Sequence, residues 1–278
     1  MVGIIILNYN NSAQTGGCLE SLYRCCTGGN YLVCVVDNAS REEEKGKISS
    51  ICTHGEHIIY SSENGGYARG NNLGCEWFDT VSEVDKILII NDDTRFTMDI
   101  ITPLEKYLDS HPECGVAFPR VNAPDGTIER DCARKSKSTR DLLLQATRLE
   151  RYGLRRKEFI PLSQVEGKDE VRTGVPPGSC MMIPKAVFKK VGWLDPNTFL
   201  YFEEHILSEK LKKLSLGCVL LPGISIIHLG AGTTKKQKSS AIYRHWRNSY
   251  LYYIRNFTDT PAVLRLYMRL RTGLKTLF

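Results

Sequence analysis

The sequence has no apolar run near the roughly 20 residues that a membrane-spanning helix needs. Its opening stretch, MVGIIIL, has neither the basic flank nor the length of a signal peptide. Internal repeats, low-complexity segments and a C-x-x-C spacing among the 10 cysteines are also missing. We therefore expect a cytoplasmic globular protein with reduced thiols packed as small apolar groups, and not a secreted, membrane-spanning or zinc-stabilised chain.

Acidic residues are scarce at the end of this 278-residue chain. Residues 235–278 hold ten Lys and Arg against the single acid Asp259, a balance of +9. The preceding 234 residues hold 27 basic and 30 acidic groups, a balance of −3, so the excess positive charge lies wholly in the last segment. This asymmetry predicts a basic, helical C-terminal segment over 235–278 that differs in character from the rest of the chain.

A helix over residues 263–277 would be strongly amphipathic. Its apolar stripe consists of Val263, Leu266, Tyr267, Leu270, Leu274 and Leu277. Four basic side chains fall beside that stripe, which is typical of a helix lying on anionic lipid, here over residues 258–278. A surface helix whose stripe covers the rest of the protein fits equally well. Nucleic acid is not expected as a partner, because the body of the chain is slightly acidic and its aromatic residues form no stacking platform.

Four apolar, β-branched runs in the first half of the chain indicate buried strands. They are Val2–Leu7, Tyr31–Val36, His57–Tyr60 and Lys86–Ile90. Helix-like stretches alternate with them at Cys18–Cys26, Glu42–Cys52, Ala68–Phe78 and Met98–Leu108. The alternation predicts an α/β fold with a mainly parallel sheet, flanked by helices on both faces. Ligands of such sheets bind at the carboxyl ends of the strands, and polar clusters follow these strands there.

The second half of the chain gives weaker signals. Residues 120–172 lack strong periodicity and read as an insertion or a mobile segment with a short helix over 142–149. The sheet pattern resumes after that segment. The elements expected there are a strand in Gly174–Ile183, helices over 184–191 and 203–214, and strands at Cys218–Leu221 and Ile224–His228.

Three acidic loops are expected at one edge of the sheet. Asp37 is placed to accept hydrogen bonds from a base imide or a ribose hydroxyl, although it could equally cap the following helix. Asp92 and Asp93 repel each other unless a cation or donors hold them, and their oxygens favour Mg²⁺ or Mn²⁺ shared with a diphosphate. A helix N-cap is the alternative for that pair. Glu203 and Glu204 could be catalytic carboxylates. Alternatively, they could simply be acids that the helix dipole favours in the first turn of a helix.

A glycine-rich loop, NGGYARGNNLG over residues 64–74, leads into a predicted helix. Free backbone N–H groups at such a position can approach a phosphate or a ribose. The loop does not follow the dinucleotide fingerprint, whose glycines lie in the first strand-to-helix turn. A nicotinamide cofactor is therefore disfavoured.

The motifs found along the chain are, in order, Asn8-Tyr9-Asn10, VDNAS over 36–40, residues 64–74, IINDDT over 89–94, Gly178-Ser179, GWLD over 192–195, YFEE over 201–204, and His228 with Gly230 and Thr233. Taken together, they resemble inverting glycosyltransferases with the GT-A fold, and most closely the bacterial rhamnosyltransferase-like enzymes that build polysaccharides. The resemblance covers about residues 2–256. It implies a GT-A catalytic domain over 1–234, divided into a nucleotide-sugar half, 1–119, and an acceptor half, 120–234.

The resemblance also implies roles for individual residues. Those expected to bind the donor are Tyr9, Asn10, Asp37, Asn64, Gly66, Tyr67, Asn71 and Asp92. Asp93 corresponds to the family's metal-binding aspartate, and His228 to a histidine that completes the metal or diphosphate site. Glu204 corresponds to the general base, with Glu203 as the alternative. The chain departs from the family where Asn91 replaces the first acid of the D-x-D-like motif and where Glu204 and Ile206 replace aspartates.

The function implied is transfer of a sugar, with inversion, from a UDP- or dTDP-sugar to a saccharide or a lipid-linked saccharide, assisted by Mn²⁺ or Mg²⁺. Such acceptors place the enzyme peripherally at the inner face of the cytoplasmic membrane. One alternative is a catalytically impaired partner protein that binds a nucleotide sugar or a lipid. Another is a nucleotidyltransferase, which would normally show an early glycine-rich loop with Arg and Lys, whereas the first strand here leads into Asn8-Tyr9-Asn10.

Overall fold

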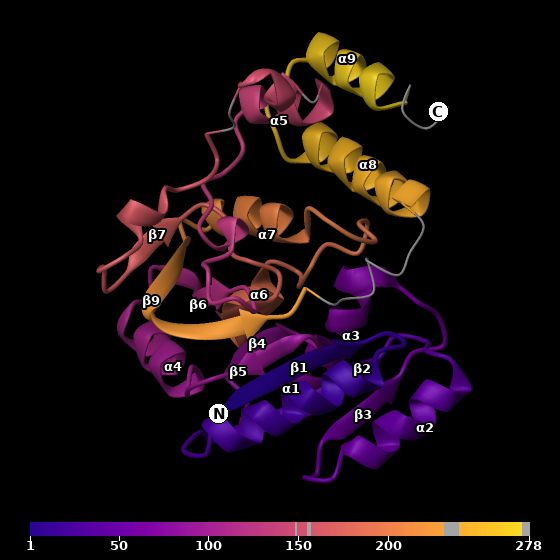
Figure 1. Cartoon of the computed structure of the whole chain (residues 1–278), viewed down its shortest axis with the longest axis vertical. Coiled ribbons are helices and arrows are strands. Elements are labelled where there is room, and N and C mark those ends of the chain that lie inside the picture. Colours follow the sequence, from indigo (N-terminus) through magenta and orange to yellow (C-terminus); the bar gives the residue numbers. More distant parts are fainter. Residues whose placement is uncertain (148, 155–156, 231–238, 274–278) are drawn as a thin grey trace.

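The computed structural model describes residues 1–147, 149–154, 157–230 and 239–273. The expected domain boundary at 234, Thr233, and the tail residues Leu274 and Leu277 lie outside the described residues. Within the described ranges, one 9-stranded sheet runs through the molecule in the order β3-β2-β1-β4-β8-β6-β9-β5, and β7 pairs with β9. Figure 1 shows helices packed around this sheet, with the two C-terminal helices at the end of the molecule farthest from β1 to β3.

The first half of the chain forms the parallel part of the sheet, as the sequence predicts. Its strands are β1 (Val2–Asn8), β2 (Tyr31–Asp37), β3 (His57–Tyr60) and β4 (Lys86–Asn91). β1 pairs in parallel with β2 and β4, and β2 pairs in parallel with β3. Because β1 is central, its residues Ile4, Ile5 and Ile6 are fully buried on both faces.

Helices cover both faces of these strands. They are α1 (Ser12–Cys25), α2 (Glu42–Ile51), α3 (Gly66–Asp79) and α4 (Ile101–Ser110). Successive side chains of a strand point to opposite faces. Ile5 contacts α3, where a Cβ at Gly74 would lie only 2.9 Å from the Ile5 side chain. Asn8 points the other way and accepts a hydrogen bond from Thr15 of α1 at 3.0 Å.

α1 begins six residues before the helix that the sequence predicts. Its first turns contain Gly16 and Gly17 and few apolar residues, so they carry no helical periodicity. Tertiary packing stabilises these turns in place of intrinsic helix propensity. The guanidinium of Arg95 lies so close to Gly17 that a Cβ there would overlap it. Arg95 also donates to the backbone carbonyl of Gln14 at 3.2 Å, which ties the start of α1 to β5.

The second half of the sheet is mixed. Its strands are β5 (Thr94–Phe96), β6 (Cys114–Asn122), β7 (Val171–Thr173), β8 (Cys180–Pro184) and β9 (Gly217–His228). β8 runs antiparallel to β4 and so joins the two halves. β9 is one strand where two are predicted, because Pro222-Gly223 interrupts the apolar pattern but produces only a register shift against β6.

The segment 120–172 has more structure than the sequence indicates. It contains α5 (Thr139–Thr147), which accounts for the expected short helix, and the 3-10 turns η1 (Arg130–Cys132), η2 (Leu149–Tyr152) and η3 (Leu162–Gln164). A buried ion pair between Lys137, just before α5, and Glu158, after η2, joins the parts of this segment on either side of α5. Isolated bridges from Arg134 to Phe159 and Val175 attach it to the segment before β8.

The remaining helices are α6 (Lys185–Lys190), α7 (Glu203–Lys212), α8 (Ser239–Asn256) and α9 (Ala262–Gly273). α8 packs Tyr250 and Tyr253 against Phe202 and Ile206 at the start of α7. α9 buries Met268 in the same cluster. No helix in the described part of the chain combines the length and apolar character needed to cross a bilayer.

The apolar stripe of α9 faces solvent. Val263, Leu266, Tyr267 and Leu270 have exposed fractions of 78%, 57%, 47% and 60%. The alternative in which this stripe covers the rest of the protein is therefore wrong for these four residues. α9 contacts the body of the protein through Met268 and Thr272 instead.

Candidate functional site

Two adjacent cavities lie beyond the carboxyl ends of the parallel strands. The first cavity, about 220 Å³, is bordered by Tyr9, Asn64, Gly66, Asp92 and Asp93, among others. The second cavity, about 480 Å³, is bordered by segment 129–137, Gly178, Glu203, Glu204 and Trp246, among others. The two cavities share a wall, whose residues are Tyr67, Asn91, Leu200 and His228. Residues from both halves of the chain therefore meet at one place.

Asp92 and Asp93 form the tight turn between β4 and β5, which excludes the helix N-cap considered for them. Both are buried, with 7% and 2% of their surface exposed. Burial and the neighbouring charge of Asp93 raise the pKa of Asp92 to about 7, although Asn11 donates to one of its oxygens at 3.0 Å. Two carboxyl groups that repel each other are thus held together at the rim of the first cavity.

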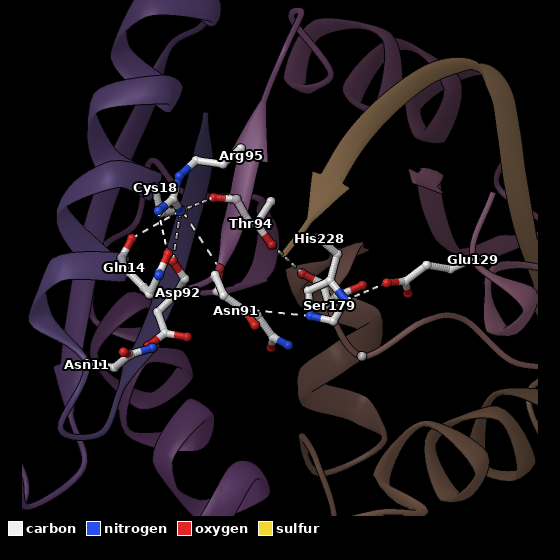
Figure 2. A network of polar contacts seen from close by, with 12 residues as sticks. Asn11, Gln14, Cys18, Asn91, Asp92, Thr94, Arg95, Glu129, Ser179 and His228 are labelled. Atoms are coloured by element: carbon white, nitrogen blue, oxygen red, sulfur yellow. Dashed lines mark hydrogen bonds and ion pairs between the residues drawn. The ribbon is translucent and has the colours of Figure 1, made fainter. Parts of the chain in front are cut away.

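His228 reaches this turn because β9 pairs with β5. The antiparallel register places His228 opposite Thr94, next to Asp93. Its Nε2 lies 3.2 Å from Asp93 Oδ1. Its Nδ1 lies 2.9 Å from Glu129 Oε1 (Figure 2). Burial alone would lower the pKa of His228, but the hydrogen bonds and negative charges of the two carboxylates outweigh it and raise that pKa to about 10. The imidazole is therefore cationic at neutral pH.

Gly178 and Ser179 connect the aspartate turn to the pair of glutamates. The carbonyl of Ser179 accepts from the backbone N–H of Asn91 at 3.0 Å (Figure 2). The carbonyl of Gly178 accepts a short hydrogen bond from the Tyr67 hydroxyl. The carboxylate of Glu204 lies directly against Gly178, so close that any Cβ at that position would overlap it. This arrangement places the Glu204 carboxylate beside Gly178, whose carbonyl contacts Tyr67 of the shared wall.

Glu203 and Glu204 are the first residues of α7. The two residues before them, Tyr201 and Phe202, have left-handed φ angles of 74° and 72°, a strained conformation for aromatic residues. Glu203 is 1% exposed, and burial together with the charge of Glu204 raises its pKa to about 8. Glu204 is half-buried and borders the second cavity. Near neutral pH, Glu203 is therefore mainly protonated and a poor proton acceptor.

The glycine-rich loop forms the start of α3. Gly66 has a φ of 77°, and a Cβ there would overlap the backbone carbonyl of Phe199. That carbonyl accepts from the N–H of Tyr67 at 2.8 Å, so the loop and the 199–200 segment are closely joined. The side chain of Asn64 accepts from Asn38 and from the N–H of Gly66, each at 3.0 Å. Asn71 borders neither cavity, because it is fully buried within α3 and donates to the carbonyl of Tyr67.

Asp37 and Asn10 are not among the residues that border the first cavity. The oxygens of Asp37 accept from the Asn8 amide at 2.7 Å and from the N–H of Ser40 at 3.0 Å. Asn10 accepts from the N–H of Arg41 at 2.9 Å. These contacts hold the loop after β2, and Asp37 does not cap α2. Direct contact of Asp37 with a base stays a prediction.

Sequence reasoning missed Glu129 and Trp246. Glu129 lies just after β6 in the segment that shows no periodicity, and nothing in the local sequence relates it to His228. Trp246 borders the second cavity from α8, where the sequence shows only a basic, aromatic-rich stretch. Asn38 also borders the first cavity and is not among the expected donor-binding residues. Unlike Glu129 and Trp246, it lies in a motif that carries the resemblance, VDNAS.

Comparisons with known proteins identify relatives of the chain. The chain is 26% identical over 263 residues to the low-salt glycan biosynthesis hexosyltransferase Agl10 of Haloferax volcanii, covering 90% of this chain and 74% of that one. It is 24% identical over 182 residues to an N-acetylglucosaminyl-diphospho-decaprenol L-rhamnosyltransferase of Mycobacterium tuberculosis, covering 65% of this chain and 57% of the relative. The chain thus spans little more than half of that second relative.

Among solved structures, the fold is similar to that of GalNAc-T7 with UDP, GalNAc and Mn²⁺, with a TM-score of 0.65 and 14% identity, over 98% of this chain and 54% of that one. This likeness confirms the expected GT-A architecture. Residues 3–192 match the protein family described as Glycosyl transferase family 2. Because that match spans most of the chain, including the turn that holds Asp93, the protein belongs to glycosyl transferase family 2.

Proposed function

We propose that the protein transfers a sugar from a UDP- or dTDP-sugar to a saccharide or lipid-linked saccharide acceptor, with inversion of configuration. One observation carries this proposal, namely that Tyr67, Asn91, Leu200 and His228 border both cavities, which therefore adjoin each other. The first cavity takes the donor beside Asp93, and the second takes the acceptor beside Glu204. A donor and an acceptor bound in these adjoining cavities would meet at the four shared residues, as transfer between them requires.

In the proposed reaction, an acceptor hydroxyl attacks the anomeric carbon from the face opposite the leaving diphosphate. A new C–O bond forms as the bond to the diphosphate breaks, and the proton of the hydroxyl passes to Glu204. Glu204 is the better base of the pair, because burial keeps Glu203 mainly protonated near neutral pH. The cationic His228 favours the negative charge that develops on the leaving diphosphate.

The donor is proposed to lie along the ends of β1 and β2. Tyr9, Asn64, Gly66 and Tyr67 border the first cavity and are placed to contact its sugar, ribose or phosphates. Asp37 and Asn10 would act on the base pocket indirectly, by holding the loop after β2 through their hydrogen bonds to Ser40 and Arg41. Recognition of the imide edge by Asp37 would require that one of its present hydrogen bonds be exchanged for one to the base.

The first cavity also has donor atoms that suit a divalent cation. In the described part of the chain, no three His, Cys, Asp or Glu side chains are grouped as a complete metal site. Mn²⁺ and Mg²⁺ need only one or two protein ligands when substrate phosphates supply the others. Asp93 offers a carboxylate oxygen, and a cation would offset the repulsion between Asp92 and Asp93. Nε2 of His228, 3.2 Å from Asp93 Oδ1, would coordinate a cation only as the neutral imidazole, so metal binding there would displace its proton. When bound, the cation would neutralise charge on the donor diphosphate.

The acceptor is proposed to be a saccharide, in some cases one linked to a lipid. The second cavity is large enough for sugar rings and offers the indole of Trp246 beside several polar groups. The exposed stripe of α9 and the basic character of the C-terminal segment favour peripheral association with an anionic membrane surface, where lipid-linked acceptors reside. No specific observation favours a nucleotidyltransferase or a catalytically impaired binding protein over this function.

Turnover of three variants tests the proposal. Glu204→Gln removes the base and Asp93→Asn removes the carboxylate beside the donor, so each should lower transfer by roughly 10²-fold or more. Glu203→Gln should retain a substantial part of the wild-type rate. The assay is release of nucleoside diphosphate from a panel of UDP-, dTDP- and GDP-sugars with and without Mn²⁺, with product configuration determined by NMR. Near-wild-type rates for both Glu204→Gln and Asp93→Asn would refute the assignment.

A further inference from the structure

A third cavity, about 730 Å³, lies between α8 and α9, away from the two cavities described above. We call it the α8–α9 groove. Four arginines line it, Arg247 and Arg255 from α8 and Arg265 and Arg269 from α9. Its apolar lining comes from Leu251, Ile254 and Leu266. Figure 1 places both helices at one end of the molecule.

The groove is a fixed feature of the fold. Arg247 donates to the backbone carbonyl of Arg269 at 3.4 Å, and Arg265 donates to that of Arg255 at 3.3 Å. Each helix therefore holds the other through an arginine. The Tyr243 hydroxyl adds a bond to the carbonyl of Thr272 at 3.0 Å. A guanidinium has five N–H donors, so these carbonyl contacts leave most of the donors of Arg247 and Arg265 available.

The positive charge of the groove is not neutralised by nearby carboxylates. Among the residues that the structure describes, no Asp or Glu forms an ion pair with any of the four arginines. Arg255 and Arg269 are exposed. Four like charges around an apolar floor repel one another unless an anion lies between them. Phosphate suits this position, because arginine binds its oxygens through paired N–H groups.

The same helix presents an apolar surface next to the groove. Leu266 lines the groove and also belongs to the exposed stripe with Val263, Tyr267 and Leu270. Apolar side chains that adjoin a cationic cleft match a lipid, whose phosphate and acyl chains are joined in one molecule. A soluble anion would account for the arginines but would leave this stripe exposed to water.

We propose that the α8–α9 groove binds the phosphate headgroup of an anionic phospholipid, while the stripe of α9 enters the bilayer beside it. This inference rests on the peripheral membrane association in the proposed function and deepens it, because it assigns binding to a defined site. Trp246 of α8 borders the second cavity, so the helix that lines the headgroup site also lines the proposed acceptor site. A lipid-linked acceptor would then approach from the surface that the groove contacts.

The test compares two double variants that lose the same charge from the same helices. Arg255→Gln with Arg269→Gln removes the two exposed arginines of the groove. Arg244→Gln with Arg271→Gln removes two exposed arginines of α8 and α9 that do not line it. The full chain is sedimented with vesicles of phosphatidylcholine alone and with vesicles that contain roughly a third phosphatidylglycerol. Arg255→Lys with Arg269→Lys retains the charge and should recover part of the binding, and thermal melts of all variants check that each is folded.

Wild type is expected to bind the phosphatidylglycerol vesicles and not those of phosphatidylcholine alone. The groove variant should lose at least about tenfold more affinity than the matched variant, because it removes contacts with the headgroup in addition to diffuse attraction. Equal losses in the two variants would overturn the groove site and leave only general electrostatic binding. Absence of wild-type binding would overturn membrane association as well. Donor turnover with a soluble acceptor tests the proposed transferase activity independently of either result.

Discussion

His228 joins three separate parts of the chain through its two ring nitrogens, with Asp93 at 3.2 Å on one side and Glu129 at 2.9 Å on the other. The pairing of β5 with β9 fixes the backbone of His228 opposite Thr94. Glu129 fixes the ring orientation from the segment after β6. A histidine held in this way presents Nε2 to the first cavity in one defined direction.

Glu129→Gln should weaken donor binding without much effect on folding. The amide can still meet Nδ1 of His228, but it removes one of the two charges that hold the imidazole in its present orientation and charge state. Changes to groups that orient a ligand residue typically cost about 10–100-fold in affinity or activity. We expect a rise of that size in the KM for the donor, with a smaller effect on kcat, measured by nucleoside diphosphate release.

A matched control is Glu113→Gln, which removes a surface partner of Arg172 and should leave donor kinetics unchanged. A drop in melting temperature with unchanged KM would show that Glu129 acts in folding and not in positioning His228. The conservative variant Glu129→Asp should recover part of the donor affinity, because it restores the charge with a shorter reach.

The parallel half of the fold could be predicted because its signals are local. Val2–Asn8 and Lys86–Asn91 are continuous apolar runs that end in polar residues, and burial on both faces of a parallel sheet requires that pattern. The cluster of Asp92, Asp93 and the glycine-rich loop follows from the same rule, because polar residues after parallel strands gather at one edge. Local sequence therefore gave both the architecture and the position of the first cavity.

The remaining features depend on contacts between distant residues. Glu129 and His228 are 99 positions apart, and a single acid in a polar segment gives no sign of such a partner. The stripe of α9 indicates that the helix is amphipathic but not which surface covers it, and here Met268 faces the protein while Leu270 faces solvent. Asp37 follows a buried strand as expected, yet its hydrogen bonds with Asn8 and Ser40 could be seen only once the loop was folded.

Gly178→Ala should lower turnover while changing stability little. The added Cβ would overlap the Glu204 carboxylate, which is the end of a flexible side chain and can move away at small cost. A displacement of roughly 1 Å at a catalytic group can reduce the rate about 10²-fold. We expect kcat to fall by roughly 10-fold to 10²-fold, with a melting temperature close to that of wild type.

The control for that substitution is Gly223→Ala in β9, where a Cβ would meet open space. Its kinetics should match wild type. If Gly178→Ala were as active as wild type, the proposal that Glu204 is the base held against Gly178 would lose its geometric support.

Gly66→Ala should destabilise the start of α3 and weaken donor binding together. Alanine at a φ of 77° costs about 1–2 kcal/mol from backbone conformation. Overlap of the new Cβ with the Phe199 carbonyl adds to that cost, because backbone cannot move as freely as a side chain. Gly126→Ala is the matched control, since Gly126 has a φ of 84° but open space around it. Thermal melts should show a clearly larger loss for Gly66→Ala, and equal losses would contradict the close approach.

Glu203→Gln should make the protein more stable at alkaline pH. Burial and the charge of Glu204 raise the pKa of Glu203 from 4.5 to about 8 in the folded state, so its contribution to stability is fully present below pH 4.5 and is lost as the pH rises through about 8. Glutamine imitates the neutral carboxyl at every pH and avoids the buried charge. The variant should therefore melt several degrees above wild type above pH 8 and close to it near pH 5, at roughly 2–4 °C per kcal/mol. Glu209→Gln is the control on the same helix. The carboxylate of Glu209 pairs with Lys212 near the surface, so this variant should not reproduce the gain. A pH-independent difference for Glu203→Gln would show that burial does not hold the Glu203 carboxyl neutral.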